Sequence, residues 1–238
     1  MTQITNRARI ISMLSVAAAI VCAAPAFADD DTDMPMNSAR IGLYSIFYHV
    51  HTDGLEGPYV PPGTSIDAKN LQTMYLGYVR TLTSHFDIEL TAGIPPLQKT
   101  VGKGPAELGS VPYNGQVIAE ARWLAPTVLL EYEFFSPQAK LRPYLGVGVN
   151  WTDFYDRDST PAGNAASGGP TRISLTSSVG VAGTVGLNYR ISGNWHAYAS
   201  YSASQVKTRL EAYTAGIERT AHINFGPQAL VVAVGYSF

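Results

Sequence analysis

The residues of this chain that could do chemistry are acids and arginines. They lie on stretches in which large apolar residues alternate with small or polar ones. They are Asp87, Glu89, Glu131, Glu133, Arg142 and Arg190. Paired carboxylates can act in general acid–base catalysis. Here, however, arginines accompany the acids, and buried charge is costly unless it is paired. We therefore predict a structural plug of ion pairs, and chemistry at these carboxylates is the alternative.

The elements that position these charges are predicted to be strands. In the last nine residues, Leu230, Val232, Val234, Tyr236 and Phe238 alternate with Val231, Ala233, Gly235 and Ser237. This is the period of a β-strand, and all the large residues share one face. A chain that ends on apolar and aromatic residues is expected if the face with the large residues contacts lipid. Its aromatic residues would then lie at a membrane–water interface.

Similar alternation recurs along the chain. Eight strands are predicted at about 38–50, 69–80, 86–94, 116–134, 141–154, 172–191, 195–212 and 222–238. The connections alternate between long, at 51–68, 95–115 and 155–171, and short. This pattern predicts an all-β fold, an eight-stranded antiparallel up-and-down transmembrane β-barrel with long loops outside and short periplasmic turns. A soluble β-sandwich is the alternative, but its strands average only about five or six residues.

The chain divides into three parts. Residues 1–28 are typical of a signal peptide, with Arg7 and Arg9 before an apolar run and a small-residue cleavage site at Ala26–Ala28. Residues 29–37 are predicted to be a periplasmic tether, and residues 38–238 the barrel. Without the predicted signal peptide and its two arginines, the chain keeps 14 of its 16 basic residues and all 18 acidic residues. Its formal charge is then −4. We expect no nucleic-acid partner from this balance.

The predicted inward face is unusually small on several strands. Its candidate lumen or ligand residues are Tyr144, Gly146, Gly148, Asn150, Ala182, Ala233 and Gly235. An eight-stranded barrel is nearly filled by its own side chains, so it cannot be a wide pore. The small residues either leave room on one side of the lumen or accommodate aromatic side chains such as Tyr144.

Prolines mark one seam of the predicted wall. Counting antiparallel pairs from Phe86 opposite Tyr132 places Ala92 beside Pro126, and Pro95 and Pro96 near Trp123. Proline lacks the N–H group that a sheet ladder needs. We therefore predict a lateral opening at Pro95, Pro96 and Pro126, with a simple bulge or strand end as the alternative.

Several segments together resemble the OmpW family of outer-membrane proteins. The central one is Lys140–Phe154 (KLRPYLGVGVNWTDF). The others are Ile88–Pro95 (IELTAGIP), Leu124–Val128 (LAPTV), Val181–Tyr189 (VAGTVGLNY) and Val234–Phe238 (VGYSF). They occur in order along essentially the whole chain after the predicted signal, although residues 195–212, rich in Ala and Ser, depart from the pattern.

The resemblance implies an eight-stranded barrel in the bacterial outer membrane that passes small hydrophobic molecules, as in related alkane-uptake barrels. Its implied partners are outer-membrane lipids and a small apolar solute; the terminal Phe238 resembles the signal read by the barrel-assembly machinery. The alternatives are a surface-interaction barrel with an occluded lumen, and a lipid-modifying enzyme. No His-x-Ser pair is present, and His49 and His51 lack a third ligand, so we expect no catalysis, metal or cofactor.

Overall fold

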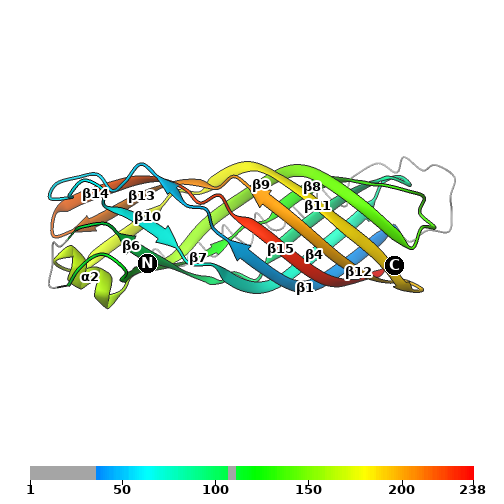
Figure 1. Ribbon diagram of the computed structural model, residues 1–238, viewed down its shortest axis with the longest axis horizontal. Coiled ribbons are helices and arrows are strands. Elements are labelled where there is room, and N and C mark those ends of the chain that lie inside the picture. The colour runs from blue at the N-terminus through cyan, green and yellow to red at the C-terminus, as the bar shows by residue number, and fades with distance from the viewer. Residues whose placement is uncertain (1–35, 107–110) are drawn as a thin grey trace, which may run out of the picture.

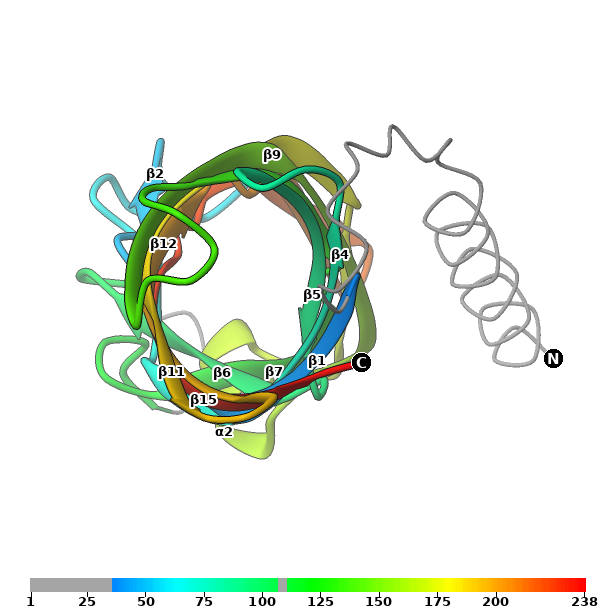
Figure 2. The same ribbon diagram turned by 90° about the vertical axis from the view of Figure 1, so that its right-hand side faces the viewer.

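The computed structural model describes residues 36–106 and 111–238. The predicted signal peptide, and the predicted tether up to residue 35, lie outside the described residues. Nearly every element in the described ranges is a strand, and the strands wind obliquely along one long axis (Figure 1). Seen along that axis they form a ring (Figure 2).

Eight antiparallel strands close the ring, which confirms the predicted barrel. They are β1 (Asn37–Phe47), β4 (Leu71–Thr81), β5 (Phe86–Gly93), β8 (Thr127–Glu133), β9 (Leu141–Ser159), β11 (Ser178–Ser192), β12 (Trp195–Ser204) and β15 (Gln228–Ser237). The order is β11-β12-β15-β1-β4-β5-β8-β9, and β9 pairs with β11 to complete the circle. The last residue joins the first strand, because the backbone N–H groups of Asn37 and Phe238 each donate to the carbonyl of the other.

The wall continues beyond this ring at one end, which we call the long-loop end (left in Figure 1). The elements there are β2 (His51–Thr52), β3 (Ser65–Ala68), β6 (Leu97–Lys103), β7 (Val117–Leu124), β10 (Thr171–Leu175), β13 (Lys207–Thr214), β14 (Ile217–Asn224) and α2 (Pro161–Ser167). No helix of the described ranges is long and apolar enough to cross a membrane.

The prediction of loops at 51–68, 95–115 and 155–171 is therefore wrong in large part, since strands and one helix occupy much of them. The reason is that this part of the wall carries charged pairs outside, such as Lys99 with Glu120 at 3.8 Å, and Lys103 with Asp67. Such strands lack the apolar outward face that identifies a lipid-facing strand.

The two faces of the ring differ as the alternation predicts. Outward residues such as Val147, Val179 and Val232 are exposed, whereas their neighbours Tyr144, Val231 and Ala233 are buried in the interior. Aromatic residues gather at the opposite, short-turn end. The rings of Trp195 and Tyr236, for instance, lie 5.1 Å apart, and similar edge contacts join Phe86, Tyr132 and Phe134. An apolar band bordered by an aromatic girdle is the surface of a barrel in lipid.

The closing seam between β1 and β15 depends on one glycine. Gly42 pairs with Ala233. A Cβ atom at Gly42 would lie 2.1 Å from the carbonyl oxygen of Val232 and 2.5 Å from the Cα of Ala233. Both contacts are with backbone, so no side-chain rotation can relieve them. At Gly183, by contrast, the nearest atom to such a Cβ is 3.8 Å away.

We predict that Gly42→Ala destabilises the folded barrel by about 1–3 kcal/mol, because overpacking forces the two strands apart. Gly183→Ala is the matched control and should unfold like the wild type. The measurement is the urea midpoint of the refolded protein in detergent micelles. Equal midpoints for the two variants would contradict the role assigned to Gly42.

Candidate functional site

The interior of the ring is crossed by a buried ion-pair cluster centred on Arg40 of β1. Arg40 Nη1 lies 3.1 Å from Glu89 Oε1 and 3.7 Å from Glu131 Oε2. Glu89 comes from β5 and Glu131 from β8, so three strands contribute. The Glu131 side chain is completely buried. We call these three side chains the charged bar.

Tyrosines surround the charged bar and fill the remaining cross-section. The Tyr75 hydroxyl donates a hydrogen bond to Glu89. The Arg40 guanidinium lies 3.9 Å from the ring centre of Tyr198 and 5.8 Å from that of Tyr144. Cation–π contacts strengthen when the cation is desolvated, so the rings help to hold Arg40 in place. The bar and its tyrosines thus form a layer across the lumen.

A second group of polar residues lies toward the short-turn end. Glu133 forms an ion pair with Arg142 and accepts a hydrogen bond of 3.0 Å from Asn188. Glu133, Arg142 and Asn188 line a polar cavity of ≈ 310 Å³. Asp87 is buried and lines this cavity too. Arg190 also borders this cavity, but its guanidinium donates to the carbonyl of Pro137.

The structure therefore gathers the acids proposed for the plug but arranges the arginines differently. Arg142 is paired with Glu133, whereas Arg190 forms no ion pair with a described acid. Arg40 is the residue that sequence reasoning missed. The sequence pattern that could have identified Arg40 is the alternation along β1. Ser38, Arg40 and Gly42 alternate with the outward Ile41 and Leu43, so Arg40 lies on the face that lines the lumen.

The small residues predicted to face the lumen have two different roles: some pack against the layer of charged side chains and tyrosines, and others border an apolar cavity. A Cβ atom at Gly186 would lie 2.5 Å from the Tyr144 ring, and one at Gly235 would lie 2.6 Å from the Tyr198 ring. Gly146 similarly lies beside the Glu131 side chain, and Gly148 against the backbone of β8. Gly146, Gly186 and Gly235 thus make room for side chains of the layer across the lumen, whereas Gly148 lets two neighbouring strands approach closely. Ala233 is buried next to the same tyrosines.

Asn150 and Ala182, in contrast, border an apolar space above the bar, which we call the upper cavity. Its volume is ≈ 70 Å³, and its walls are formed mainly by aromatic and aliphatic side chains. Among them are Tyr44, Ile46, Tyr48, Trp123, Phe154 and Phe225. Asn150 is satisfied within the wall, because it donates to Thr127 at 2.8 Å and accepts from Thr152 at 2.7 Å.

The wall of the upper cavity is interrupted where the prolines were predicted to weaken it. The β5–β8 ladder ends at the pair Thr91–Thr127, and pairing resumes only at Leu97–Arg122 between β6 and β7. Pro95, Pro96 and Pro126 lie between these pairs. A side-chain bond of 3.0 Å from Arg122 to the Pro95 carbonyl spans the break. We call the segments 92–96 and 123–126 the proline seam.

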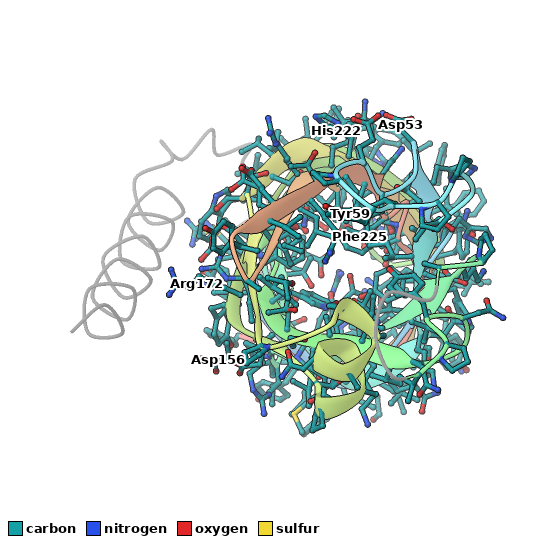
Figure 3. The ribbon with its side chains drawn as sticks, turned by 90° about the vertical axis from the view of Figure 1, so that its left-hand side faces the viewer. Asp53, Tyr59, Asp156, Arg172, His222 and Phe225 are labelled. Atoms are coloured by element: carbon teal, nitrogen blue, oxygen red, sulfur yellow. The ribbon has the colours of Figure 1, made fainter. Side chains whose placement is uncertain are left out.

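A second apolar space of ≈ 70 Å³, the outer cavity, lies within the long-loop end. Phe225 borders both cavities and packs against Tyr48 and Phe154. In Figure 3, which looks into this end, Phe225 lies inside the ring while His222 and Arg172 lie at its rim. Phe225 thus separates the outer cavity from the upper cavity.

The described residues contain no group of three or more His, Cys, Asp or Glu side chains that could hold a metal ion. The apolar band, the closed ring and the narrow, layered interior define an integral β-barrel of the bacterial outer membrane. The chain belongs to the OmpW family, whose model matches residues 42–238.

Individual relatives cover the chain over most of its length. Outer membrane protein W of Vibrio cholerae is 29% identical over 226 residues, which cover 94% of this chain and 97% of the relative. The dibenzothiophene metabolism operon protein PahQ of Pseudomonas aeruginosa is 23% identical, covering 84% of this chain and 87% of that protein. The crystal structure of OprG from Pseudomonas aeruginosa shares the fold, with a TM-score of 0.77, 19% identity and coverage of 86% and 97%.

We predict that Arg40→Gln destabilises the barrel by about 3–5 kcal/mol, because it leaves Glu89 and Glu131 buried without their cation. The triple variant R40Q/E89Q/E131Q should recover most of that loss, since no uncompensated charge remains. Urea unfolding in micelles measures both effects. Arg80→Gln, at a hydrogen-bonded arginine of β4 near the short-turn end, is the control. A triple variant as unstable as the single one would refute the ion-pair account.

Proposed function

We propose that this barrel admits small apolar solutes at the long-loop end and releases them sideways into the outer membrane through the proline seam. The observation that carries the proposal is the position of the upper cavity. It is apolar, the charged bar lies beneath it, and an interrupted stretch of wall lies beside it.

The charged bar makes a straight path to the periplasm unfavourable. A solute moving from the upper cavity toward the short-turn end would have to displace Arg40 from Glu89 and Glu131. Separating buried, paired charges costs several kcal/mol, and an apolar molecule offers no polar contact in return. The polar cavity beyond the bar is likewise a poor environment for such a solute.

The proline seam offers the alternative exit. Thr91, Trp123, Ala125 and Thr127 border the upper cavity from the seam side. On the outer surface, Ile94 and Leu97 are 47% and 41% exposed, so the mouth of the seam is apolar. Only one described side-chain bond, from Arg122, crosses the break between the two ladders. Moving the strands apart there breaks fewer hydrogen bonds than opening an intact ladder.

Membership of the OmpW family supports a role for this chain as a barrel of the outer membrane. The name of PahQ associates that relative with dibenzothiophene metabolism, and dibenzothiophene is a small apolar aromatic compound. The aromatic side chains of Tyr44, Trp123 and Phe154 match a solute of this chemical class, although the cavity of ≈ 70 Å³ has to enlarge before it can hold one. Aromatic side chains pack favourably against aromatic ligands in offset or edge-on arrangements.

We predict that tying the seam shut abolishes release. In the double variant Ile94→Cys/Leu124→Cys, a thiol cross-link would join the two strands across the break, since both residues continue the β5–β8 register. Naphthalene flux into cells should fall to the level of cells without the protein, and a reducing agent should restore it. The only native cysteine, Cys22, lies in the predicted signal peptide.

The matched control is Ile88→Cys/Leu130→Cys, which joins the same two strands at an intact, outward-facing pair. Its cross-link should leave flux unchanged. If the seam cross-link also leaves flux unchanged, the lateral path is refuted. If neither variant nor wild type differs from cells without the protein, the barrel is better described as a surface-interaction protein with an occluded lumen.

We also propose that the barrel-assembly machinery recognises the chain by its terminal aromatic residue. Phe238 ends the apolar face of β15, and its backbone completes the closing seam with Asn37. Deleting Phe238 should lower the fraction of folded barrel in the outer membrane severalfold. Phe238→Tyr, which keeps an aromatic ring, should retain it. Efficient insertion of the deleted form, measured by heat-modifiable migration on gels, would contradict this proposal.

A further inference from the structure

The outer cavity contains a buried arginine that the proposed path does not use. Arg219 lies on β14, where alternate residues Arg219, Ala221 and Ile223 point into the barrel. It borders the outer cavity together with Ile66, Tyr113, Leu210 and Phe225. The lining of the cavity is mainly apolar. Glu120 also borders it, and its carboxylate pairs with Lys99 at 3.8 Å.

Arg219 has no ionic partner among the described residues. It is only 5% exposed, it forms no ion pair with a described carboxylate, and its Nε atom is buried without an acceptor. Its stem packs against the backbone at Gly57, where a Cβ atom would lie 3.2 Å from Arg219 Cγ.

A buried, unpaired guanidinium is an expensive feature to keep. Arginine stays protonated under physiological conditions, so burial leaves it charged rather than neutral. Burial lowers the pKa of Arg219 from its usual value, while the nearby Tyr113 raises it. The same burial raises the pKa of Tyr113 well above its ordinary value, so this hydroxyl stays neutral and offers no counter-charge. The described residues thus leave the positive charge of Arg219 without an ion pair at the border of a mainly apolar cavity.

We propose that the outer cavity is a binding site for small amphipathic acids, with the carboxylate paired to Arg219 and the apolar body lying toward Phe225. The planar guanidinium fork matches a carboxylate in geometry and charge. The inference deepens the proposed uptake function by naming its preferred solutes, and rests on that function for the direction of passage. The cavity volume of ≈ 70 Å³ restricts the site to short chains.

The size of the site also explains why Phe225 matters. A cavity that holds benzene has a volume of about 150 Å³. The outer cavity alone is smaller, so the chain of a ligand has to displace the Phe225 ring, which separates the two cavities, and extend into the upper cavity. The acid would thus be held at Arg219 while its tail already occupies the apolar route toward the proline seam.

Binding can be measured directly on the full-length mature protein in nanodiscs, without any transport assay. Hexanoate is the probe, and 1-hexanol, with the same chain and no charge, is the matched comparison. We expect hexanoate to shift the NMR signals of the Arg219 Nε–H and of the β14 amides. Arg219→Gln should weaken its binding roughly ten-fold or more, since hydrogen bonds to charged groups contribute strongly. Arg219→Lys should retain part of it.

Two control variants make the result decisive. Arg209→Gln, at an exposed arginine of β13 that pairs with Glu211, should leave hexanoate binding unchanged. Glu107 lies outside the described residues, so Glu107→Gln tests whether its carboxylate already occupies the guanidinium. Hexanoate binding that appears only in Glu107→Gln would overturn the proposal. So would equal affinity of Arg219→Gln and wild type, or binding of 1-hexanol as tight as that of hexanoate.

Two measurements, naphthalene flux and hexanoate binding, distinguish a failure of this inference from a failure of the proposed function. If the lateral path is wrong, the cross-linked seam leaves naphthalene flux unchanged, while hexanoate still shifts the Arg219 signal. If the acid site is wrong, hexanoate binding ignores Arg219, while naphthalene flux still depends on the seam. Arg209→Gln, at an exposed arginine outside both apolar cavities, should leave naphthalene flux near the wild-type level.

Discussion

The constraint on which the structure depends is that lipid offers no hydrogen-bond partner to a backbone. Every N–H and C=O group in the membrane must therefore be paired within the protein, and an antiparallel sheet can achieve this only by closing on itself. The reciprocal bonds between Asn37 and Phe238 and the pairing of β9 with β11 complete that closure. The proline seam is informative because it relaxes this constraint at one place in the wall.

Charge inside the ring imposes a second constraint, and it divides the lumen. Glu89, Glu131 and Glu133 require cations, and Arg40 and Arg142 supply them from two other strands. The resulting layer leaves a polar cavity toward the short-turn end and apolar cavities above it. An eight-stranded barrel has little free volume. A single layer of paired charges and tyrosines is therefore enough to separate the polar cavity from the apolar cavities.

The proposed route has three stations: the outer cavity with Arg219, the side chain of Phe225, and the upper cavity beside the proline seam. Each station differs in chemistry. The first offers charge to an acid, the second an aromatic surface, and the third an apolar wall with few backbone bonds to break. Under this proposal the gradient favours small molecules that carry an acidic group and a short apolar part, because they gain contacts at each stage without having to cross the charged bar.

The sequence by itself determined the barrel and its lipid face, and it showed three prolines where the ladder between β5 and β8 ends. Alternation of period two places Val147 or Val232 outside, and proline at 95, 96 and 126 removes ladder donors wherever the strands lie. The tertiary structure alone decided which charges meet. Arg40 pairs with Glu89 and Glu131, and Arg190 does not, because ion pairing depends on strand neighbours and register around a closed ring. The strands of the long-loop end were hidden for a related reason: their outer face meets water, so no apolar pattern distinguishes them from loops.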